Sequence, residues 1–395
     1  MTIDLSQIIT NLQSDVNAAD SDTSMRDILS LLHRGKKVTE LHKWYDSAGV
    51  LPIDSAYNGY MAFTKSDNTM RVFNDSDLRW AELDSSYTAA PSAPVYAGTN
   101  YGYSMGGGSS PYTQNIDNYP FASDTNATNV GAMNNPDGTA VWSGSGGGSA
   151  THGYHLGGTP VNPFSSPIFK FPYTSGTPIS DTGNDIAASQ VHRYGHYEMC
   201  GDRTNIYIVG GYRGPAYPTL ANKNTILSFA ATSDGSTITD YGDLTVARRF
   251  NQTGTSETHG YSAGGYTSAA INTIDKWPFA ASANATDVGD LTVAGYAATG
   301  ASSSTHGYIA GALTPSATNV IEKYSFSVDG NSSDVADLFE QKNQAAGASS
   351  TTHGYLAGGN PATATIQKYS FTADENGTDV GDLAFARRAN AGTHY

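Results

Sequence analysis

The tetrapeptide Thr-His-Gly-Tyr occurs four times in this chain, and each copy is followed, after two intervening residues, by a Gly-Gly or Gly-Ala pair. Two degenerate copies, YGYSMGG and NIYIVGG, align with these four on the glycines. The six copies recur about every 50 residues, with their tyrosines at Tyr103, Tyr154, Tyr207, Tyr261, Tyr308 and Tyr355. Self-similarity at this period is typical of solenoids, propellers and other arrays, so it constrains the fold more than any other feature of the sequence.

Two further signals recur at a fixed phase within each copy. After the glycines come an isoleucine, two more residues and an aromatic residue, at Ile116/Tyr119, Ile168/Phe171, Ile226/Phe229, Ile274/Trp277, Ile321/Tyr324 and Ile366/Tyr369. A polar segment follows, and then an Asp or Asn with a neighbour such as Val or Ile, as in Asp379-Val380. Four copies continue to an Asp-Leu step, at Asp243, Asp290, Asp337 and Asp382. The repeating unit is therefore the whole segment and not only the tetrapeptide.

Each copy is expected to form four short strands, because apolar and polar residues alternate over short runs between clusters of Gly, Pro, Asn and Ser. In the last complete copy the predicted strands are AAGASS, HGYLAGG, ATIQKYSF and DVGDLAF. Asn376-Gly377 predicts a tight hairpin turn between the third and fourth strands, since both residues tolerate positive φ. Four strands per repeat match one blade of a β-propeller. We expect the Gly-Gly pairs next to the propeller axis, where blades crowd together.

An apolar strand that ends in Gly-Gly, with an aromatic residue about ten positions later in the next strand, resembles the kelch-type blade. The resemblance covers residues 91–395 and implies a mainly β fold with a six-bladed kelch-like β-propeller. The second aromatic residue of kelch blades, usually Trp, is replaced here by Val or Ile in five copies, with Tyr241 as the exception. The blades are therefore kelch-like and depart from the usual kelch pattern at this position.

The last residues of the chain suggest how the propeller closes. In RRANAGTHY, Thr393-His394 begins another repeat but stops before its glycines. Propellers close when one terminal segment supplies the first strand of a shared blade. We expect Ala389–Tyr395 to pair beside the Tyr103 copy; the alternative is that Ala90–Tyr96 supplies this strand and the C-terminus is exposed.

Residues 1–46 have the apolar spacing of helices, with one stripe at Ile3, Leu5, Ile8, Ile9 and Leu12, and a second at Met25, Ile28, Leu29, Leu31 and Leu32. Two short amphipathic helices do not bury both stripes by themselves. We expect them to anchor or oligomerise the protein, with copies of themselves, a host structure or the propeller as the partner.

Residues 47–90 are predicted to form a small β-hairpin module. Within them, GYMAFTKSDNTMRVFNDSDLRWAEL contains three short strands, with a turn at Ser66-Asp67-Asn68 and the last strand at Trp80. This pattern resembles a small three-stranded module of phage tail fibres and other virion appendages. The whole layout, with its THGY-x-x-GG repeats, resembles predicted virion proteins of marine phages, especially cyanophages.

This resemblance implies a non-enzymatic virion structural protein, a tail fibre or a neck or capsid fibre, used for host attachment or particle decoration. It would be assembled in the host cytoplasm and exposed on the particle. Its N-terminal region would join other virion proteins, and the resemblance also implies a trimer. A host surface glycan or protein would be the receptor.

Composition excludes several other classes of protein. The chain has 21 Lys+Arg against 36 Asp+Glu, a net charge of −15, which disfavours nucleic-acid binding because phosphate contacts need a basic surface. No apolar run approaches the roughly 18 residues of a membrane helix, and the first residues, MTIDLSQ, lack the regions of a signal peptide. A single cysteine, Cys200, excludes an internal disulfide and any multi-cysteine metal site; we expect it to be a buried, small apolar residue.

The repeated polar residues are expected to have structural roles. The histidines His152, His259, His306 and His353 would form a ring with one member per blade, too far apart to share a metal ion. We expect His and Thr to satisfy backbone groups at a strand start. The glycines that follow, Gly157, Gly210, Gly264 and Gly358, are likewise assigned to the repeat. The Asp pairs should hydrogen-bond their own backbone two residues on, with calcium binding as the alternative.

No catalytic residue, metal site or cofactor is predicted. His192 and His196 are spaced like metal ligands, but stacking against Tyr194 and Tyr197 is favoured. A glycan-active propeller enzyme, hydrolase or lyase, is the alternative function; it would need a non-repeating pair of carboxylates, and the sequence offers none to name. A decoration subunit without a receptor-binding role is a further alternative. An intracellular adaptor of the eukaryotic kelch kind would need a recognisable oligomerisation domain upstream.

Inserted loops in the first three repeats are the predicted binding surface. They are SSPYTQN, TPVNPFSSP and GYRGPAYPTLANKN, and repeat proteins place binding sites in such loops. The candidate surface-binding residues are Tyr112, Phe164, Tyr212, Arg213 and Tyr217, which suit glycan stacking or protein docking. The same loops would equally suit packing on a neighbouring virion subunit.

Overall fold

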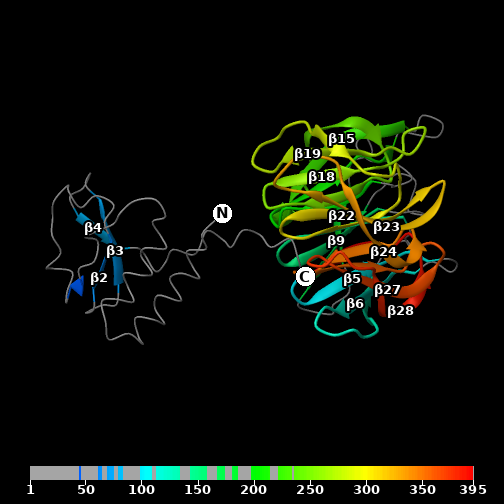
Figure 1. Cartoon of the computed structure of the whole chain (residues 1–395), viewed down its shortest axis with the longest axis horizontal. Helices are drawn as coiled ribbons and strands as arrows, with labels where there is room; N and C mark the ends of the chain where they lie inside the picture. The colour runs from blue at the N-terminus through cyan, green and yellow to red at the C-terminus, as the bar shows by residue number, and fades with distance from the viewer. Residues whose placement is uncertain are drawn as a thin grey trace. The chain divides into compact units, whose positions relative to one another are not determined.

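The computed structural model describes strands at 44–45, 61–64, 69–74 and 79–82, and then residues 98–108, 113–133, 143–157, 167–173, 180–185, 197–213, 221–233 and 235–394. The described residues are mainly β strand (Figure 1). The chain divides into two compact units, residues 1–93 and residues 94–395. No helix in the described ranges is both long enough and apolar enough to span a membrane.

Unit 1 contains one four-stranded sheet in the order β1-β2-β3-β4. Its strands are β1 (Trp44–Tyr45), β2 (Met61–Thr64), β3 (Thr69–Asn74) and β4 (Arg79–Glu82). β2, β3 and β4 are antiparallel neighbours, as the sequence predicted, whereas the parallel pairing of β1 with β2 was not predicted. The helices predicted within residues 1–46 lie outside the described residues.

Unit 2 is a six-bladed β-propeller, which confirms the predicted architecture (Figure 1). Blade 1 contains β29 (Ala391–His394), β5 (Tyr101–Met105), β6 (Asn115–Pro120) and β7 (Thr128–Ala132). Blade 2 contains β8 (Ser145–Gly148), β9 (His152–Leu156), β10 (Pro167–Pro172) and β11 (Ser180–Asp185). Blade 3 contains β12 (Glu198–Gly201), β13 (Asn205–Val209), β14 (Tyr212–Arg213), β15 (Ala221–Ala230) and β16 (Thr239–Arg248), with a short 3-10 helix at Ala231–Ser233.

The other three blades follow the same plan. Blade 4 contains β17 (Gln252–Thr255), β18 (His259–Ala263), β19 (Thr273–Pro278) and β20 (Thr286–Asp290). Blade 5 contains β21 (Thr299–Ser302), β22 (His306–Thr314), β23 (Ser316–Ser325) and β24 (Ser333–Lys342). Blade 6 contains β25 (Ala346–Ser349), β26 (His353–Ala357), β27 (Thr363–Ser370) and β28 (Thr378–Arg387), which confirms the four strands predicted for the last complete repeat.

The first strand of each blade is the innermost. These inner strands, β8, β12, β17, β21, β25 and β29, contact one another in a closed ring. β29 pairs with β5 in a register that places Thr393 opposite Tyr103, so the C-terminal strand closes the propeller and the C-terminus lies beside β5 (Figure 1). The closure predicted for Ala389–Tyr395 is confirmed, and the alternative closure by Ala90–Tyr96 is wrong because β29 occupies that edge.

The axis is lined by different glycines from those predicted. The Gly-Gly pairs end the second strand of a blade, where both residues have positive φ: +67° at Gly210 and +104° at Gly211. The glycines at the axis belong to the inner strands instead. A Cβ on Gly392 would lie 2.2 Å from the carbonyl oxygen of Gly347, and one on Gly146 would lie 2.2 Å from that of Gly392. Four of the six inner strands have glycine at this position, Gly146, Gly300, Gly347 and Gly392, whereas Met199 and Thr253 occupy it in blades 3 and 4. The inner strands crowd closely where this side chain is missing.

The Asn376-Gly377 step does not form the tight turn that the sequence predicted, because neither residue has a positive φ. It links two blades instead. The Asn376 side-chain oxygen accepts the backbone N–H of Asp337 in blade 5 at 3.0 Å, and the Gly377 N–H donates to the Asp337 carbonyl at 2.7 Å. The same contact recurs between Asn284 and Asp243, Asn331 and Asp290, and Asn126 and Asp382.

The residue after the repeated isoleucine also links neighbouring blades. It is Asp117, Asp275, Glu322 or Gln367 in four blades, and each of these side chains is buried. Each accepts a backbone N–H from the end of the preceding blade, donated by Ala384, Thr245, Thr292 and Glu340 respectively. Two of them, Asp117 and Asp275, also form fully buried ion pairs, with Arg387 and Arg248.

Aromatic side chains fill the spaces between the blades. The tyrosine of the repeated tetrapeptide packs on a phenylalanine of the next blade, as Tyr308 does on Phe371 at a centroid separation of 4.6 Å. The glycine of the tetrapeptide lies beneath the aromatic residue of the third strand in its own blade. At Gly307, an added Cβ would lie 2.2 Å from the Tyr324 ring. The glycine of the tetrapeptide and the aromatic residue that follows the repeated isoleucine are therefore in contact with each other within a blade.

Replacing Gly307 with Ala is expected to lower the free energy of unfolding by about 1–3 kcal/mol, because the buried Tyr324 ring has to move. Thermal unfolding of the full chain measures the effect. Gly330→Ala is the matched control, since a Cβ there meets nothing within 4 Å, and its effect should stay within about 0.5 kcal/mol. Equal effects at the two positions would contradict the explanation.

Candidate binding site at the axial channel

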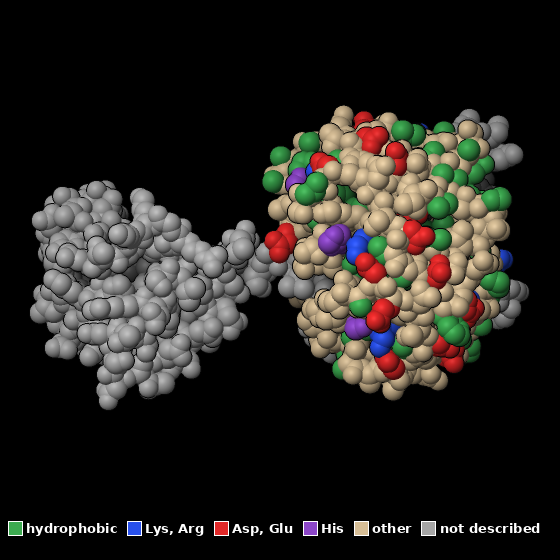
Figure 2. All heavy atoms as spheres, in the orientation of Figure 1, with side chains coloured by type: hydrophobic (Ala, Val, Ile, Leu, Met, Phe, Trp, Pro, Cys, Tyr) green, Lys and Arg blue, Asp and Glu red, His purple; other side chains and the backbone are tan. Residues whose placement is uncertain are grey.

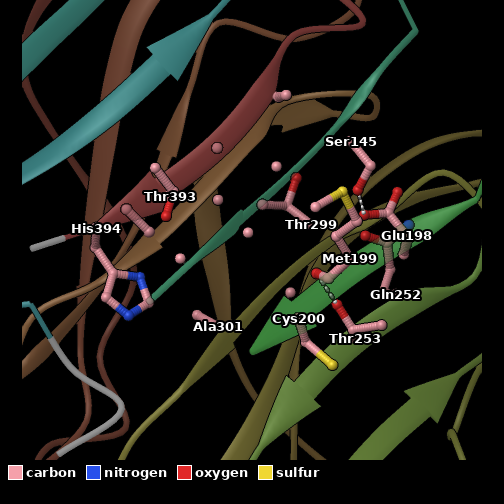
Figure 3. Close-up of a pocket in the computed structure, with 18 of the residues that line it drawn as sticks. Ser145, Glu198, Met199, Cys200, Gln252, Thr253, Thr299, Ala301, Thr393 and His394 are labelled. Atoms are coloured by element: carbon pink, nitrogen blue, oxygen red, sulfur yellow. Dashed lines mark hydrogen bonds between the residues drawn. The ribbon is translucent and has the colours of Figure 1, made fainter. Parts of the chain in front are cut away.

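The six inner strands surround a cavity of about 210 Å³ on the propeller axis (Figure 3). Each inner strand pairs with its own blade on one side only, so its other edge faces the axis. Unpaired backbone N–H and C=O groups on that edge need water or a ligand as hydrogen-bond partners. The channel is therefore a polar tube, with glycine backbone forming much of its wall.

One end of this channel is lined by the first residues of the inner strands: Ser145, Glu198, Gln252, Thr299, Ala346 and Ala391. Figure 3 shows the side chains of Ser145, Glu198 and Gln252 grouped together. Ser145 Oγ donates a hydrogen bond to Glu198 Oε2 at 3.2 Å. Among the described residues that line the cavity, Glu198 is the one acidic side chain.

Burial sets the protonation state of Glu198. Loss of solvent raises the pKa of its carboxyl to about 8, and the hydrogen bond from Ser145 only partly opposes this. A carboxyl with this pKa is mostly protonated at neutral pH. At this end the channel wall is therefore neutral and presents hydroxyl, amide and carboxylic acid groups.

At the opposite end of the channel, hydrogen bonds join neighbouring blades. The backbone N–H of Thr255 donates to Ser302 Oγ at 2.9 Å, and that of Ser302 donates to Ser349 Oγ at 2.9 Å. The N–H of Ser349 donates to His394 Nδ1 at 3.3 Å. Because these polar groups are used between neighbouring strands, this end has a structural role.

Aromatic side chains and an arginine form the rim at the Glu198 end. We call Tyr212, Arg249, Phe250, Tyr266 and Tyr296 the rim cluster; each is half-buried, and Phe250 also lines the cavity. The Arg249 guanidinium lies 4.3 Å from the Tyr212 ring centroid and 5.1 Å from that of Tyr266. The Tyr266 and Tyr296 rings are 5.0 Å apart, and those of Phe250 and Tyr296 are 5.8 Å apart. The cluster is thus continuous from the channel to blade 3.

Charge is distributed unevenly between the two faces of the propeller. The connections 249–251, 296–298, 343–345 and 388–390, and the loops 264–272 and 358–362, surround the Glu198 end and contain no Asp or Glu. Three ion pairs are formed on the opposite face, between Lys276 and Asp329, Lys323 and Asp374, and Lys368 and Asp124. A fourth, between Lys342 and Glu340, lies at the end of β24 beside the connection 343–345. Figure 2 shows acidic, basic and histidine side chains spread over the visible propeller surface. The whole chain has a net charge of −15, but these segments around the channel mouth contain Arg249 and no acidic residue.

Of the five residues predicted for the binding surface, the structure places one, Tyr212, in this site. Tyr212 belongs to the rim cluster. Arg213 ends β14, with its side chain outside the described residues, and Tyr112, Phe164 and Tyr217 lie outside them altogether. His192 and His196 do as well. Cys200 is buried, as predicted, and burial raises the pKa of its thiol.

The repeated histidines begin the second strand of their blades, on the face opposite the rim cluster. Each places Nδ1 beside the hydroxyl of the preceding threonine, at 2.8 Å for His152, His259 and His353 and at 2.9 Å for His306. The backbone N–H groups at this strand start are satisfied by a serine, at Ser149, Ser256, Ser303 and Ser350, and not by the His or Thr side chain. Burial, and then a neighbouring lysine, lower the pKa of His259, His306 and His353.

The repeated aspartates behave partly as predicted. The Asp287 and Asp379 carboxylates each accept the backbone N–H two residues on, at 3.2 Å, from Gly289 and Gly381. In the part of the chain that the structure describes, no three His, Cys, Asp or Glu side chains gather closely enough to hold a metal ion.

Sequence reasoning missed Glu198, Gln252, Arg249, Tyr266 and Tyr296. The available signal was departure from the repeat. Glu198 and Gln252 occupy positions that hold Ala346 and Ala391 in other blades, and Tyr296 occupies the place of Asn343. Arg249 gave no such signal, because Arg388 holds the same place in blade 6. Neither a protein-family model nor a curated protein sequence matches this chain.

Proposed function

We propose that this protein is a non-enzymatic structural protein of a phage virion, a tail fibre or other appendage whose kelch-like propeller attaches the particle to its host. The observation that carries the proposal is the axial cavity with the rim cluster beside one of its ends. Half-exposed aromatic side chains beside a polar cavity are the usual contact groups for a ligand. The closed ring of blades holds these side chains on a rigid scaffold.

The resemblance to virion proteins of marine phages, especially cyanophages, supports the biological setting of this proposal. In that setting unit 1 joins the chain to other virion proteins, a trimer is the expected assembly, and the propeller is exposed on the particle. A host surface glycan or protein is the receptor.

The enzyme alternative gains no specific support from the channel. Glycoside hydrolysis usually requires two carboxylates, one on each side of the scissile bond. Glu198 is the one carboxyl among the described lining residues, so they offer no acid–base pair. A decoration role without receptor binding uses the same fold, and an adsorption experiment separates it from attachment.

The purified full chain is expected to bind host cells and to reduce the adsorption of particles that carry it, because it would occupy the same receptors. Tyr296→Ala, in the rim cluster, should weaken cell binding about tenfold, since a central aromatic contact commonly contributes more than 1 kcal/mol. Val328→Ala is the matched control, because Val328 is 70% exposed on the opposite face. Fluorescence of labelled protein on cells measures both.

Three other results would contradict attachment through this site. Antibody labelling of the particle without any binding to cells would indicate a decoration subunit. Release of reducing sugar from host glycans would indicate an enzyme. Equal loss of cell binding in the two variants would remove the rim cluster from the attachment surface.

A further inference from the structure

We propose that the rim cluster binds an acidic saccharide, with the carboxylate of the sugar on Arg249 and its ring against Tyr266, Tyr296 and Phe250. This inference rests on the proposed function, because it names the class of receptor that the attachment surface would recognise. It is carried by the contacts of Arg249, the position of the aromatic rings and the charge around the channel mouth.

Arg249 differs from the arginine next to it. Arg248 is fully buried, pairs with Asp275, and donates to the carbonyl oxygens of Gly264 and Thr273 at 3.0 Å. Arg249 is half-buried, and its hydrogen bond to a side chain is a long one, from Nη1 to Asn222 Oδ1 at 3.4 Å. No described carboxylate forms an ion pair with it. One arginine holds the blades together, and the other remains available to a ligand.

The rings around Arg249 prepare it for a carboxylate. Tyr212 and Tyr266 lie 4.3 Å and 5.1 Å from the guanidinium carbon, so stacking restricts the guanidinium plane and leaves its N–H edges for a partner. A planar guanidinium donates two parallel hydrogen bonds to a carboxylate. Tyr266, Tyr296 and Phe250 extend from this point to the channel, and aromatic faces pack against the apolar side of a sugar ring.

The channel wall beneath the rim suits the rest of such a ligand. Ser145, Glu198, Gln252 and Thr299 present groups that hydrogen-bond to sugar hydroxyls. Because the Glu198 carboxyl is mostly protonated at neutral pH, it adds no negative charge against an anionic sugar.

This arrangement makes binding depend on pH. The neighbouring strands β8 and β17 place Ser145 and Gln252, which are both uncharged, next to Glu198. The following residues of β12 itself are Met199 and Cys200. Tyr197, before β12, is buried; Arg203 and His394 line the opposite end of the channel. As the pH rises through the raised pKa of about 8, Glu198 becomes negative while the sugar carboxylate stays ionised. Affinity therefore falls with rising pH.

Calorimetric titration of the full chain with an oligogalacturonate, and with its neutral methyl ester, tests the proposal. The acid should bind at least about tenfold more tightly than the ester, since a charge-assisted bidentate contact is lost in the ester. Arg249→Gln should weaken binding of the acid about tenfold. Arg388→Gln, at the equivalent place in blade 6 with its Nη1 on Asn360 Oδ1 at 3.0 Å, is the matched control and should change binding less than about twofold.

The pH dependence supplies a second readout. Affinity for the acid should fall between about pH 6.5 and about pH 9, and Glu198→Gln should remove most of this fall because the amide does not ionise. Unchanged melting temperatures of the variants would show that each is folded. Equal binding of acid and ester, or equal losses in Arg249→Gln and Arg388→Gln, would overturn the proposal. If the acid fails to bind while cell binding still depends on Tyr296, the inference fails and attachment stands; if cells are not bound, the proposed function fails.

Discussion

Replacing Arg387 with Met is expected to lower the free energy of unfolding of the propeller by roughly 3–5 kcal/mol, because it leaves the buried Asp117 carboxylate without its cation. The two side chains are fully buried. Arg387 also donates to the carbonyl oxygens of Gly106 and Asn115 at 3.3 Å, so the change removes several contacts between the last blade and the first. Thermal or denaturant unfolding of the full chain measures the loss.

An exposed ion pair between the same two blades provides the control. Lys368 Nζ lies 2.6 Å from Asp124 Oδ1, with the aspartate side chain about half exposed. Lys368→Met should cost less than about 1 kcal/mol, because solvent screens such pairs. Equal effects of the two substitutions would show that Arg387 does not hold the blades together.

A double variant separates the buried charge from the shape of the site. Asp117→Asn combined with Arg387→Met leaves no ionised group, while the amide oxygen still accepts the N–H of Ala384. Blade 6 already uses an amide at this position, where Gln367 accepts the N–H of Glu340 at 3.1 Å. The double variant should therefore recover part of the stability lost in Arg387→Met. A further loss of stability would contradict this account.

Deleting residues 391–395 should lower the stability of the propeller by roughly 4 kcal/mol or more, since each lost backbone hydrogen bond contributes about 1 kcal/mol net. β29 pairs with β5 at four positions, from Ala391 opposite Met105 to His394 opposite Gly102. Its removal exposes the β5 edge and opens the ring of inner strands. We expect a broad thermal transition at a much lower temperature, measured by circular dichroism.

Thr393→Val is the control for this deletion. It keeps the strand but removes the hydrogen bond between the hydroxyls of Tyr173 and Thr393, 3.1 Å apart. The expected cost is about 0.5–1.5 kcal/mol, the net contribution of one hydrogen bond. A deletion that leaves the melting temperature unchanged would mean that another segment closes the ring.

Several elements of the fold could be predicted from the sequence because the same pattern of one blade occurs six times. The strands of the last repeat and the closing strand followed from alternation and from the partial repeat at Thr393-His394. The roles of individual residues were harder to predict. Asn376-Gly377 was assigned to a tight turn, yet Asn376 accepts the N–H of Asp337 in the neighbouring blade. Local preference predicts a turn there, whereas the contact between blades decides the conformation.

The candidate site could also be predicted only in part from the sequence. Tyr212 was named from its place in an inserted loop, but its partner Arg249 comes from the end of blade 3. Arg249 in turn contacts Tyr266, which lies in the loop after the second strand of blade 4. Glu198 was not named, although it departs from the alanines at this position in blades 6 and 1, because a departure from the repeat does not show that a side chain faces the axis. Its raised pKa depends on the other strands around the axis, which bury most of its side chain.

The sequence by itself determined the repeat, the four-stranded blade, the number of blades and the closing segment, because period and alternation are properties of neighbours along the chain. Only the tertiary structure decided which glycines line the axis, which of two adjacent arginines is buried, and which side chains surround the channel. Those properties depend on residues far apart in sequence, such as Arg387 and Asp117, which come together only when the ring closes.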